Sequence, residues 1–480
     1  MKHSKKMMVR AGLAAAVLFS LSGVFSGSAE AAEKIYDGIS RWGATEATEG
    51  DPITVNELNG WGSSETHLVH LTVGTKDTQN VTVHNYSAGE GSTAEVHGRN
   101  ISFGGEYGDK QIGGFWVDTG TITIGDEDTK NISLTEMRGQ KGAQITINGG
   151  SESLNLGKIN VGQTIIRAGG ANTGKVTVDS IGLWGNYHDD DQRVYGADVV
   201  IDGTQGITVN QGVAVTMKSK LQLGTENNRG DVQFGLAPGT TVSVSVDNES
   251  TTDITAGGKI STAGDLRVYQ DSAVSMRGAA IDINGFVNAA STANEDDDKV
   301  PQISLIAEDS NGKRGDVYAH NMEVDNQGRI TVKGDTVTID DSDSKAKWKR
   351  NHSIDATTGS SVSVDSNALI MNKGVFFQGG GEMNLTGNKK VIIGTAGDNP
   401  GQSIHMDNGS LFVGGNEAET TLNGSVFMEA GVQKQNSSAT IDGNTITINA
   451  SIMPDQIKKG GGLRKRPGYL CTGYEAYHWP

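Results

Sequence analysis

The tripeptide Arg-Gly-Asp occurs twice, and it is the clearest candidate binding motif of the chain. The two copies are Arg229-Gly230-Asp231 and Arg314-Gly315-Asp316. In an exposed loop, such a tripeptide offers a guanidinium and a carboxylate to a host integrin. Both copies follow turn-forming residues, and a Gly-Asp pair also simply makes a turn. The sequence leaves two interpretations open, a structural turn and an integrin-binding loop.

Two acidic runs are the candidates for calcium binding or sugar cleavage. Residues 189–191 are three aspartates flanked by His188 and Arg193, and residues 296–298 are three more. Calcium takes six or more oxygens that converge from several segments. Glycoside cleavage uses two carboxylates at a set separation. A contiguous run supplies neither arrangement by itself, so we predict solvated loops.

The remaining patterns predict no metal, no cofactor and no catalytic residue. His67 and His70 lie three positions apart, which in a strand places them on opposite faces. The glycine run 379–381 has no following Lys-Ser or Lys-Thr, and no Gly-x-Ser-x-Gly sequence occurs. The basic run 458–466 could touch an anionic surface, although a solvated tail is the simpler interpretation.

Short β-strands are the elements that must position any site. An apolar–polar–apolar triplet of β-forming residues, bounded by Gly, Asn or Asp, returns along most of the chain, and no stretch between the triplets has helical spacing. Period-two alternation buries one face of a strand and leaves the other in water. The triplets include 53–55, 71–73, 81–83, 122–124, 132–134, 145–147, 176–178, 207–209, 242–246, 330–332, 337–339, 362–364 and 446–448.

Two all-β architectures use such short strands, a series of hairpin sandwiches and a parallel β-helix. The 480 residues include 67 Gly and only 7 Pro, and no linker divides the pattern into sandwich-sized pieces. Polar Asn and Thr residues crowd the turns, where stacked coils would align them in ladders. These features favour a parallel β-helix over residues 32–452. Three breaks in the rhythm, 184–198, 291–301 and 340–353, predict loops that protrude from it.

The start of the chain predicts export. Four basic residues precede the apolar stretch Ala11–Phe25, and Ala29-Glu30-Ala31 forms a cleavage site. We expect residues 1–31 to be a cleaved signal peptide. The remainder holds 36 basic and 56 acidic residues, a net charge of −20, which repels nucleic acid and anionic membranes. The single cysteine, Cys471, excludes an intramolecular disulfide.

Together these features resemble the passenger region of a type V autotransporter, a family of bacteria with an outer membrane. The resemblance covers residues 1 to about 450 and rests on the signal peptide, the glycine-rich Ile-Thr-Val repeats, the acidic charge and the lack of disulfides. It implies a right-handed parallel β-helix that is displayed on the cell surface or secreted. The family's C-terminal translocator barrel has no counterpart here. Residues 453–480 form instead a basic, aromatic tail, which is either a cap or anchor or the product of a frameshift.

The function expected from this resemblance is that of a non-enzymatic, adhesin-like surface protein, or a truncated version of one. Its partners would be proteins or glycans of a host or neighbouring cell, with no nucleic acid among them. Contact with the outer membrane would need a separate translocator. The alternative is a secreted polysaccharide-degrading β-helix, either a lyase or a hydrolase, which would need Asp, Arg and His residues from adjacent coils to converge in one cleft. A fragment without function is the third possibility.

Overall fold

Every regular element of the described chain is a β-strand, so the expected all-β class is confirmed. None of the residues described forms a helix that could span a membrane. The structure is a computed structural model. It describes residues 32–40, 46–60, 69–89, 91–104, 106–107, 110–111, 115–117, 119–187, 194–291, 300–340, 352–396, 402–429, 437–449 and 452–454. The expected signal peptide and most of the tail lie outside these ranges.

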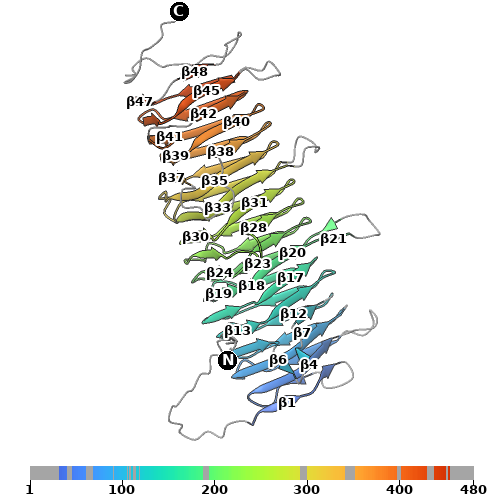
Figure 1. Ribbon diagram of the computed structural model, residues 1–480. Coiled ribbons are helices and arrows are strands. Elements are labelled where there is room, and N and C mark those ends of the chain that lie inside the picture. Colours follow the sequence, from blue (N-terminus) through green and yellow to red (C-terminus); the bar gives the residue numbers. More distant parts are fainter. Residues whose placement is uncertain are drawn as a thin grey trace, which may run out of the picture.

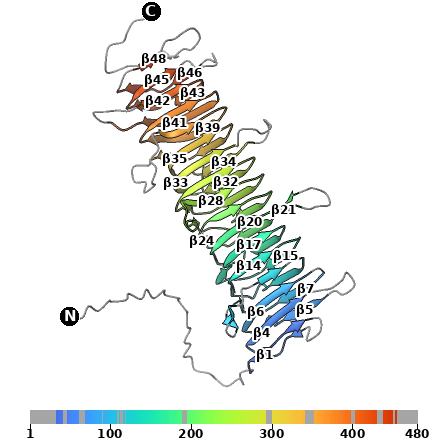
Figure 2. The same ribbon diagram turned by 45° about the vertical axis from the view of Figure 1, so that its right-hand side comes forward.

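The strands stack into one elongated rod, with β1 (Lys34–Tyr36) near one end and β48 (Ile452–Pro454) at the other (Figure 1). Within the described ranges, a single system of 44 strands makes up the rod. All of its described pairings are parallel and join strands of successive coils, which excludes the hairpin sandwich for this region. The same stacking is visible after a turn of the rod (Figure 2).

Three parallel ladders run along the rod, and each coil of the chain visits them in the order first, second, third. The first ladder consists of β1, β4 (Ile53–Gly60), β6 (Asn80–Ala88), β8 (Asn100–Phe103), β13 (Asn131–Leu134), β16 (Ser153–Asn155), β19 (Lys175–Val178), β24 (Ile207–Val209), β27 (Val232–Phe234), β30 (Lys259–Thr262), β33 (Ala280–Ala290), β35 (Val317–Asp325), β37 (Thr336–Ile339), β39 (Ser361–Met371), β41 (Glu382–Ile393), β44 (Glu419–Leu422) and β47 (Thr445–Ile448).

The second ladder uses the later parts of β4, β6, β33 and β35. Its other strands are β2 (Ile39–Ser40), β11 (Phe115–Val117), β14 (Glu136–Gly139), β17 (Lys158–Gly162), β20 (Ser180–Trp184), β25 (Val213–Val215), β28 (Val242–Val246), β31 (Asp265–Tyr269), β38 (His352–Ala356), β40 (Gly374–Gln378), β42 (Gln402–Asp407), β45 (Ser425–Glu429) and β48.

The third ladder uses the first parts of β39 and β41. Its other strands are β3 (Glu46–Ala47), β5 (His70–Val73), β7 (Thr93–Val96), β12 (Thr121–Ile124), β15 (Gln144–Ile147), β18 (Ile165–Gly169), β23 (Asp198–Asp202), β26 (Lys220–Leu223), β29 (Thr251–Thr255), β32 (Ala273–Gly278), β34 (Gln302–Ala307), β36 (Arg329–Lys333), β43 (Gly409–Gly414) and β46 (Ser437–Ile441).

Among the strands that the structure describes, two small antiparallel hairpins stand apart from the ladders. One joins β9 (Glu106–Tyr107) to β10 (Lys110–Gln111), and the other joins β21 (Asn186–Tyr187) to β22 (Val194–Tyr195). The second hairpin falls within the predicted break at 184–198, at the corner between β20 of the second ladder and β23 of the third. It places Tyr195 beside the surface of the rod, where the candidate site lies.

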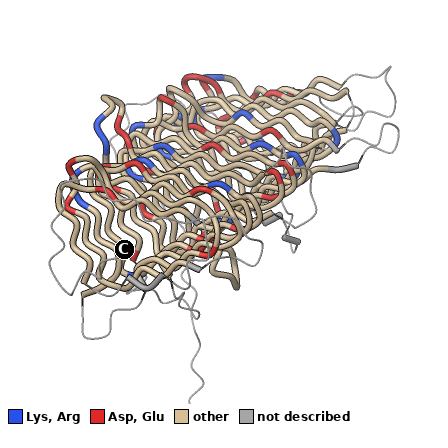
Figure 3. The backbone as a smooth tube through the Cα atoms, turned by 90° about the horizontal axis from the view of Figure 1, so that it is seen from above, with Lys and Arg blue, Asp and Glu red and all other residues tan. Residues whose placement is uncertain are grey.

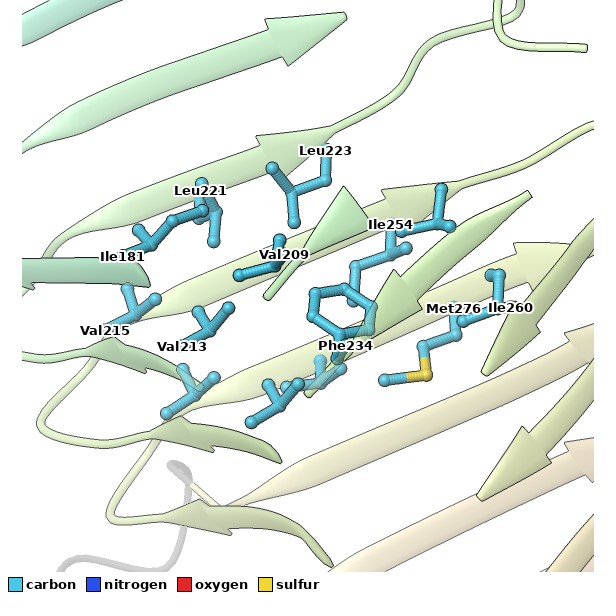
Figure 4. Packing of buried hydrophobic residues seen from close by; sticks show 14 of the residues in the cluster. Ile181, Val209, Val213, Val215, Leu221, Leu223, Phe234, Ile254, Ile260 and Met276 are labelled. Carbon is cyan, nitrogen blue, oxygen red and sulfur yellow. The ribbon is translucent and has the colours of Figure 1, made fainter. Parts of the chain in front are cut away.

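The core fills the inside of the rod with the apolar residues of the triplets. Register partners stack on one another from coil to coil, as Ile122 does on Ile145 and Ile145 on Ile166. Figure 4 shows the same packing in the middle of the rod, around Val209, Val213 and Phe234. This stacking gives most buried apolar side chains an apolar neighbour in an adjacent coil.

The predicted alternation is wrong at β28. The triplet pattern of 242–246 places Val242 inside, but the register shifts between Val242 and Val244, and Ser243 is buried instead. Val242 is only half-buried. A bulge changes the side of the strand on which a residue faces, and alternation alone does not reveal it.

Asparagines form one of the expected polar ladders at the start of the first-ladder strands. The Asn100 amide donates to the side chain of Asn80 at 3.1 Å, and the Asn131 amide donates to that of Asn100 at 3.0 Å. Ser153 Oγ continues the row by donating to Asn131 at 2.7 Å. These bonds tie successive coils together outside the core and help to fix their register.

Three large rings pack together in the core near the N-terminal end of the described rod. The centroid of Tyr86 lies 5.1 Å from that of Phe115 and 6.4 Å from that of Phe103, and the two Phe rings meet edge to face at 5.4 Å. The Tyr86 hydroxyl is buried and has no hydrogen-bond partner among the residues described. Burial raises the pKa of this phenol well above its ordinary value of 10.0.

We expect Tyr86→Phe to leave the fold intact and to stabilise it by about 1 kcal/mol at pH 7, because the substitution removes an unpaired buried hydroxyl. The effect should depend on pH. Because folding raises the pKa of Tyr86, the unfolded chain loses the phenol proton first, and the free energy of unfolding of the parent protein falls as the pH rises above about 10. The Tyr86→Phe variant lacks this loss. Urea unfolding at pH 7 and pH 11 would measure this. A variant that loses as much stability as the parent protein at pH 11 would show that another group controls alkaline unfolding.

Candidate functional site

The first Arg-Gly-Asp copy lies in the turn that leads into β27. Asp231 uses two oxygens to join three coils: its main-chain oxygen accepts from Ile207 N at 2.9 Å, and its Oδ1 accepts from Lys259 N at 2.8 Å. The Arg229 side chain is exposed. A Cβ on Gly230 would lie 2.3 Å from the Gln205 carbonyl oxygen, so this glycine is required by close contact with the preceding coil.

The second copy lies in the equivalent turn before β35. The main-chain oxygen of Asp316 accepts from Ile281 N at 2.9 Å, and its Oδ1 accepts from Thr336 N at 3.2 Å. The Arg314 guanidinium makes a forked ion pair with Asp365, at 3.0 Å and 2.7 Å. A ligand carboxylate would therefore compete with Asp365 for this arginine.

The two aspartates thus have the same role in the ladder. Each accepts one amide from the coil before and another from the coil after, at the start of a first-ladder strand. These contacts give a physical reason for both Gly-Asp pairs that involves no ligand. Integrin binding by either tripeptide stays a prediction.

Removing the Asp231 carboxylate should loosen the turn. We expect Asp231→Ala to cost about 1 kcal/mol, because Lys259 N loses its acceptor. Asp231→Asn keeps an acceptor oxygen and should stay close to the parent protein. Hydrogen exchange at the Lys259 amide measures the effect, and equal exchange in both variants would show that the carboxylate does not hold this amide.

The acidic runs at 189–191 and 296–298, together with His188, Arg193, His67 and the basic run 458–466, lie outside the described residues. His70 is described, and its Nδ1 lies 2.7 Å from Thr93 Oγ1 in the next coil. Within the described ranges, no group of three His, Cys, Asp or Glu side chains is placed to hold a metal ion.

A hollow of about 490 Å³ lies at the corner where the second ladder gives way to the third, and we call it the corner hollow. It is lined by residues of three coils: Lys141, Gly142, Gln163, Ile165, Tyr195, Gly196 and Asp198. Its volume lies within the range of small-ligand sites, about 300–1,000 Å³.

Two large apolar side chains are exposed in the corner hollow. Tyr195, at the end of the β21–β22 hairpin, is 45% exposed, and Ile165, at the start of β18, is 41% exposed. The register partners of Ile165 are Gln144 and Asp198, which are polar. Ile165 is therefore an apolar residue in an outward row of polar ones, as expected for a contact surface rather than for the core.

Charge surrounds the corner hollow. The Asp198 carboxylate lies 2.9 Å from Arg167, and the same guanidinium donates to the Asp198 main-chain oxygen at 2.9 Å. Lys141 and Gln163 add a cationic and an amide group to the lining. Acidic and basic residues are interspersed along the described part of the rod (Figure 3).

A second hollow, of about 460 Å³, lies on the third ladder across β29, β32, β34 and β36, and we call it the face hollow. The hollow forms where the outward side chains are small, as at Ala273, Ser275 and Ser304. Asp253 is the one carboxylate among its lining residues, and Arg329 is the one cation. The lining therefore lacks the second carboxylate that glycoside hydrolysis requires.

Neither hollow was predicted from the sequence. The one available signal for the corner hollow was Ile165. It stands next to the buried Ile166, at a position where the alternation predicts a polar residue. The sequence did not place Tyr195 near Lys141, because Tyr195 lies in an insertion whose length does not follow the repeat. Comparisons with protein families, with curated proteins and with solved structures found no match to this chain.

Proposed function

We propose that this chain is an exported, non-enzymatic surface protein that works as an adhesin, built as a right-handed parallel β-helix like the passenger of a type V autotransporter. Parallel strand connections are right-handed in about 98% of cases, which supports the handedness. The observation that carries the proposal is the corner hollow, which is lined by two exposed side chains, Ile165 and the Tyr195 of the β21–β22 hairpin.

The rod supports this function in a second way. Its three ladders form a regular scaffold that carries insertions at its corners, and binding residues commonly lie on loops held by such scaffolds. Partners would be proteins or glycans of a host or neighbouring cell. Residues 1–31 would direct the chain out of the cytoplasm and then be removed.

Binding of the purified chain, residues 32–480, to immobilised host matrix proteins and polysaccharides tests the proposal. Bound protein and released sugar are both recorded. We expect saturable binding without release of sugar. Released reducing or unsaturated sugar would replace the adhesin with a polysaccharide-degrading enzyme, and the absence of any binding would remove the adhesin proposal.

The Arg-Gly-Asp copies are tested in the same assay through a double variant, Asp231→Asn with Asp316→Asn. Both changes keep an acceptor oxygen for the next coil and remove the charge that an integrin would bind. Loss of binding to integrin-coated wells, with binding to other surfaces retained, would support the tripeptide prediction. Unchanged binding to every surface would leave the tripeptides with their structural role alone.

A further inference from the structure

We infer that the corner hollow binds a pyranose ring of a neutral glycan, with Tyr195 as the stacking platform. This inference rests on the proposed adhesin function and names the ligand class of its site. It follows from three features of the lining: an exposed aromatic ring beside an aliphatic floor, polar groups around both, and the charge of the whole chain.

The aromatic and aliphatic groups come first. Of the five large apolar side chains that are strongly exposed within the described ranges, two line this one hollow, Tyr195 and Ile165. The face of an aromatic ring carries negative charge, so it attracts the polarised C–H groups on the flat side of a sugar. Ile165 can cover the rest of that apolar side.

The polar groups of the lining suit the hydroxyl groups at the edge of a sugar ring. The lining includes the amide of Gln163, the carboxylate of Asp198 and the ammonium group of Lys141, so both donor and acceptor chemistry is present at its rim. Sugar hydroxyls both donate and accept, so they match this mixture. The Arg167 guanidinium lies 2.9 Å from an oxygen of the Asp198 carboxylate. This ion pair orients the carboxylate and neutralises its charge.

The chain charge narrows the ligand class. With 36 basic and 56 acidic residues after residue 31, the rod repels a polyanion at long range. A sulfated or uronic-acid polymer is therefore disfavoured, and a neutral glycan is favoured. A peptide fits less well, because two apolar side chains give a small anchor and the rest of the lining is polar.

A printed array of neutral and sulfated glycans, with a peptide array beside it, tests the inference on residues 32–480. We expect saturable binding to at least one neutral glycan. Tyr195→Ala should weaken that binding about tenfold, which is the scale of one lost aromatic contact with its buried area. Tyr195→Trp should retain it, and Ile165→Thr should weaken it without changing the outward position of the side chain.

Trp116→Ala is the matched control. Trp116 is 45% exposed, as Tyr195 is, but it lies on β11 and outside the corner hollow, so its loss should leave glycan binding unchanged. Binding that is equally strong in Tyr195→Ala would overturn the inference, and so would binding to sulfated glycans alone. Binding to proteins or peptides without glycans would overturn the inference while leaving the adhesin function in place.

Discussion

Replacing Gly315 by alanine should disrupt the coils around the second Arg-Gly-Asp copy. An added Cβ would lie 1.8 Å from the carbonyl oxygen of Ala279 in the preceding coil. The backbone cannot easily move away, because Gly315 N donates to Ala307 O at 3.0 Å and its oxygen accepts from Asp335 N at 2.6 Å. We expect the free energy of unfolding to fall by about 3 kcal/mol, which is at the upper end for overpacking. Faster hydrogen exchange at the amides of Ile281 and Asp335 would measure this loss.

Gly182→Ala provides the control. It makes the same change in β20, where the nearest atom to the added Cβ is 3.8 Å away, an ordinary contact. Unchanged exchange in Gly315→Ala would mean that the two coils separate at little cost. The expected result has a practical meaning, because a glycine variant of this tripeptide would report on folding rather than on recognition.

Phe103→Ala should strongly destabilise the aromatic cluster of Tyr86, Phe103 and Phe115. Phe103 is buried against Phe115 and Tyr86, with centroid distances of 5.4 Å and 6.4 Å. Removing a buried phenyl ring costs about 3–5 kcal/mol, since both the transfer energy and the packing around the new cavity are lost. Urea unfolding followed by circular dichroism would measure it.

The matching truncation of an exposed ring is Trp116→Ala on the neighbouring strand β11, and it should cost far less because 45% of that side chain is already in water. Stacked coils interact mainly with their neighbours, so the loss in Phe103→Ala should concentrate near β8 and β11. Equal losses in both variants would contradict the assignment of Phe103 to a tightly packed core.

The regular part of the fold could be predicted because each strand carries its own signal. The triplet 122–124 became β12 with both isoleucines buried, and 132–134 lies within β13 with Ile132 and Leu134 buried. Apolar alternation determines which face is buried, and the steady return of the triplet indicates stacking. The parallel pairing followed from the length of the pattern without any divider.

The candidate site could not be predicted in the same way. Lys141, Ile165 and Tyr195 meet only because three coils of unequal length are stacked in register. The separation between equivalent residues is 20 between Asn80 and Asn100 but 31 between Asn100 and Asn131. The sequence shows no rule for these lengths, so neighbours across coils remained unknown. The roles of Asp231 and Asp316 as amide acceptors were hidden for the same reason.

The register of the first ladder has a consequence for inheritance. Ile132, Leu154 and Val176 are partners in successive coils, and neighbouring equivalents such as Asn131 and Ser153 are 22 residues apart. A gene deletion that removed codons 132–153 would bring Leu154 to the place of Ile132, and all later coils would keep their partners. Recombination between repeats could therefore lengthen or shorten this molecule one coil at a time, while every coil outside the deleted or duplicated segment passes to descendants unchanged.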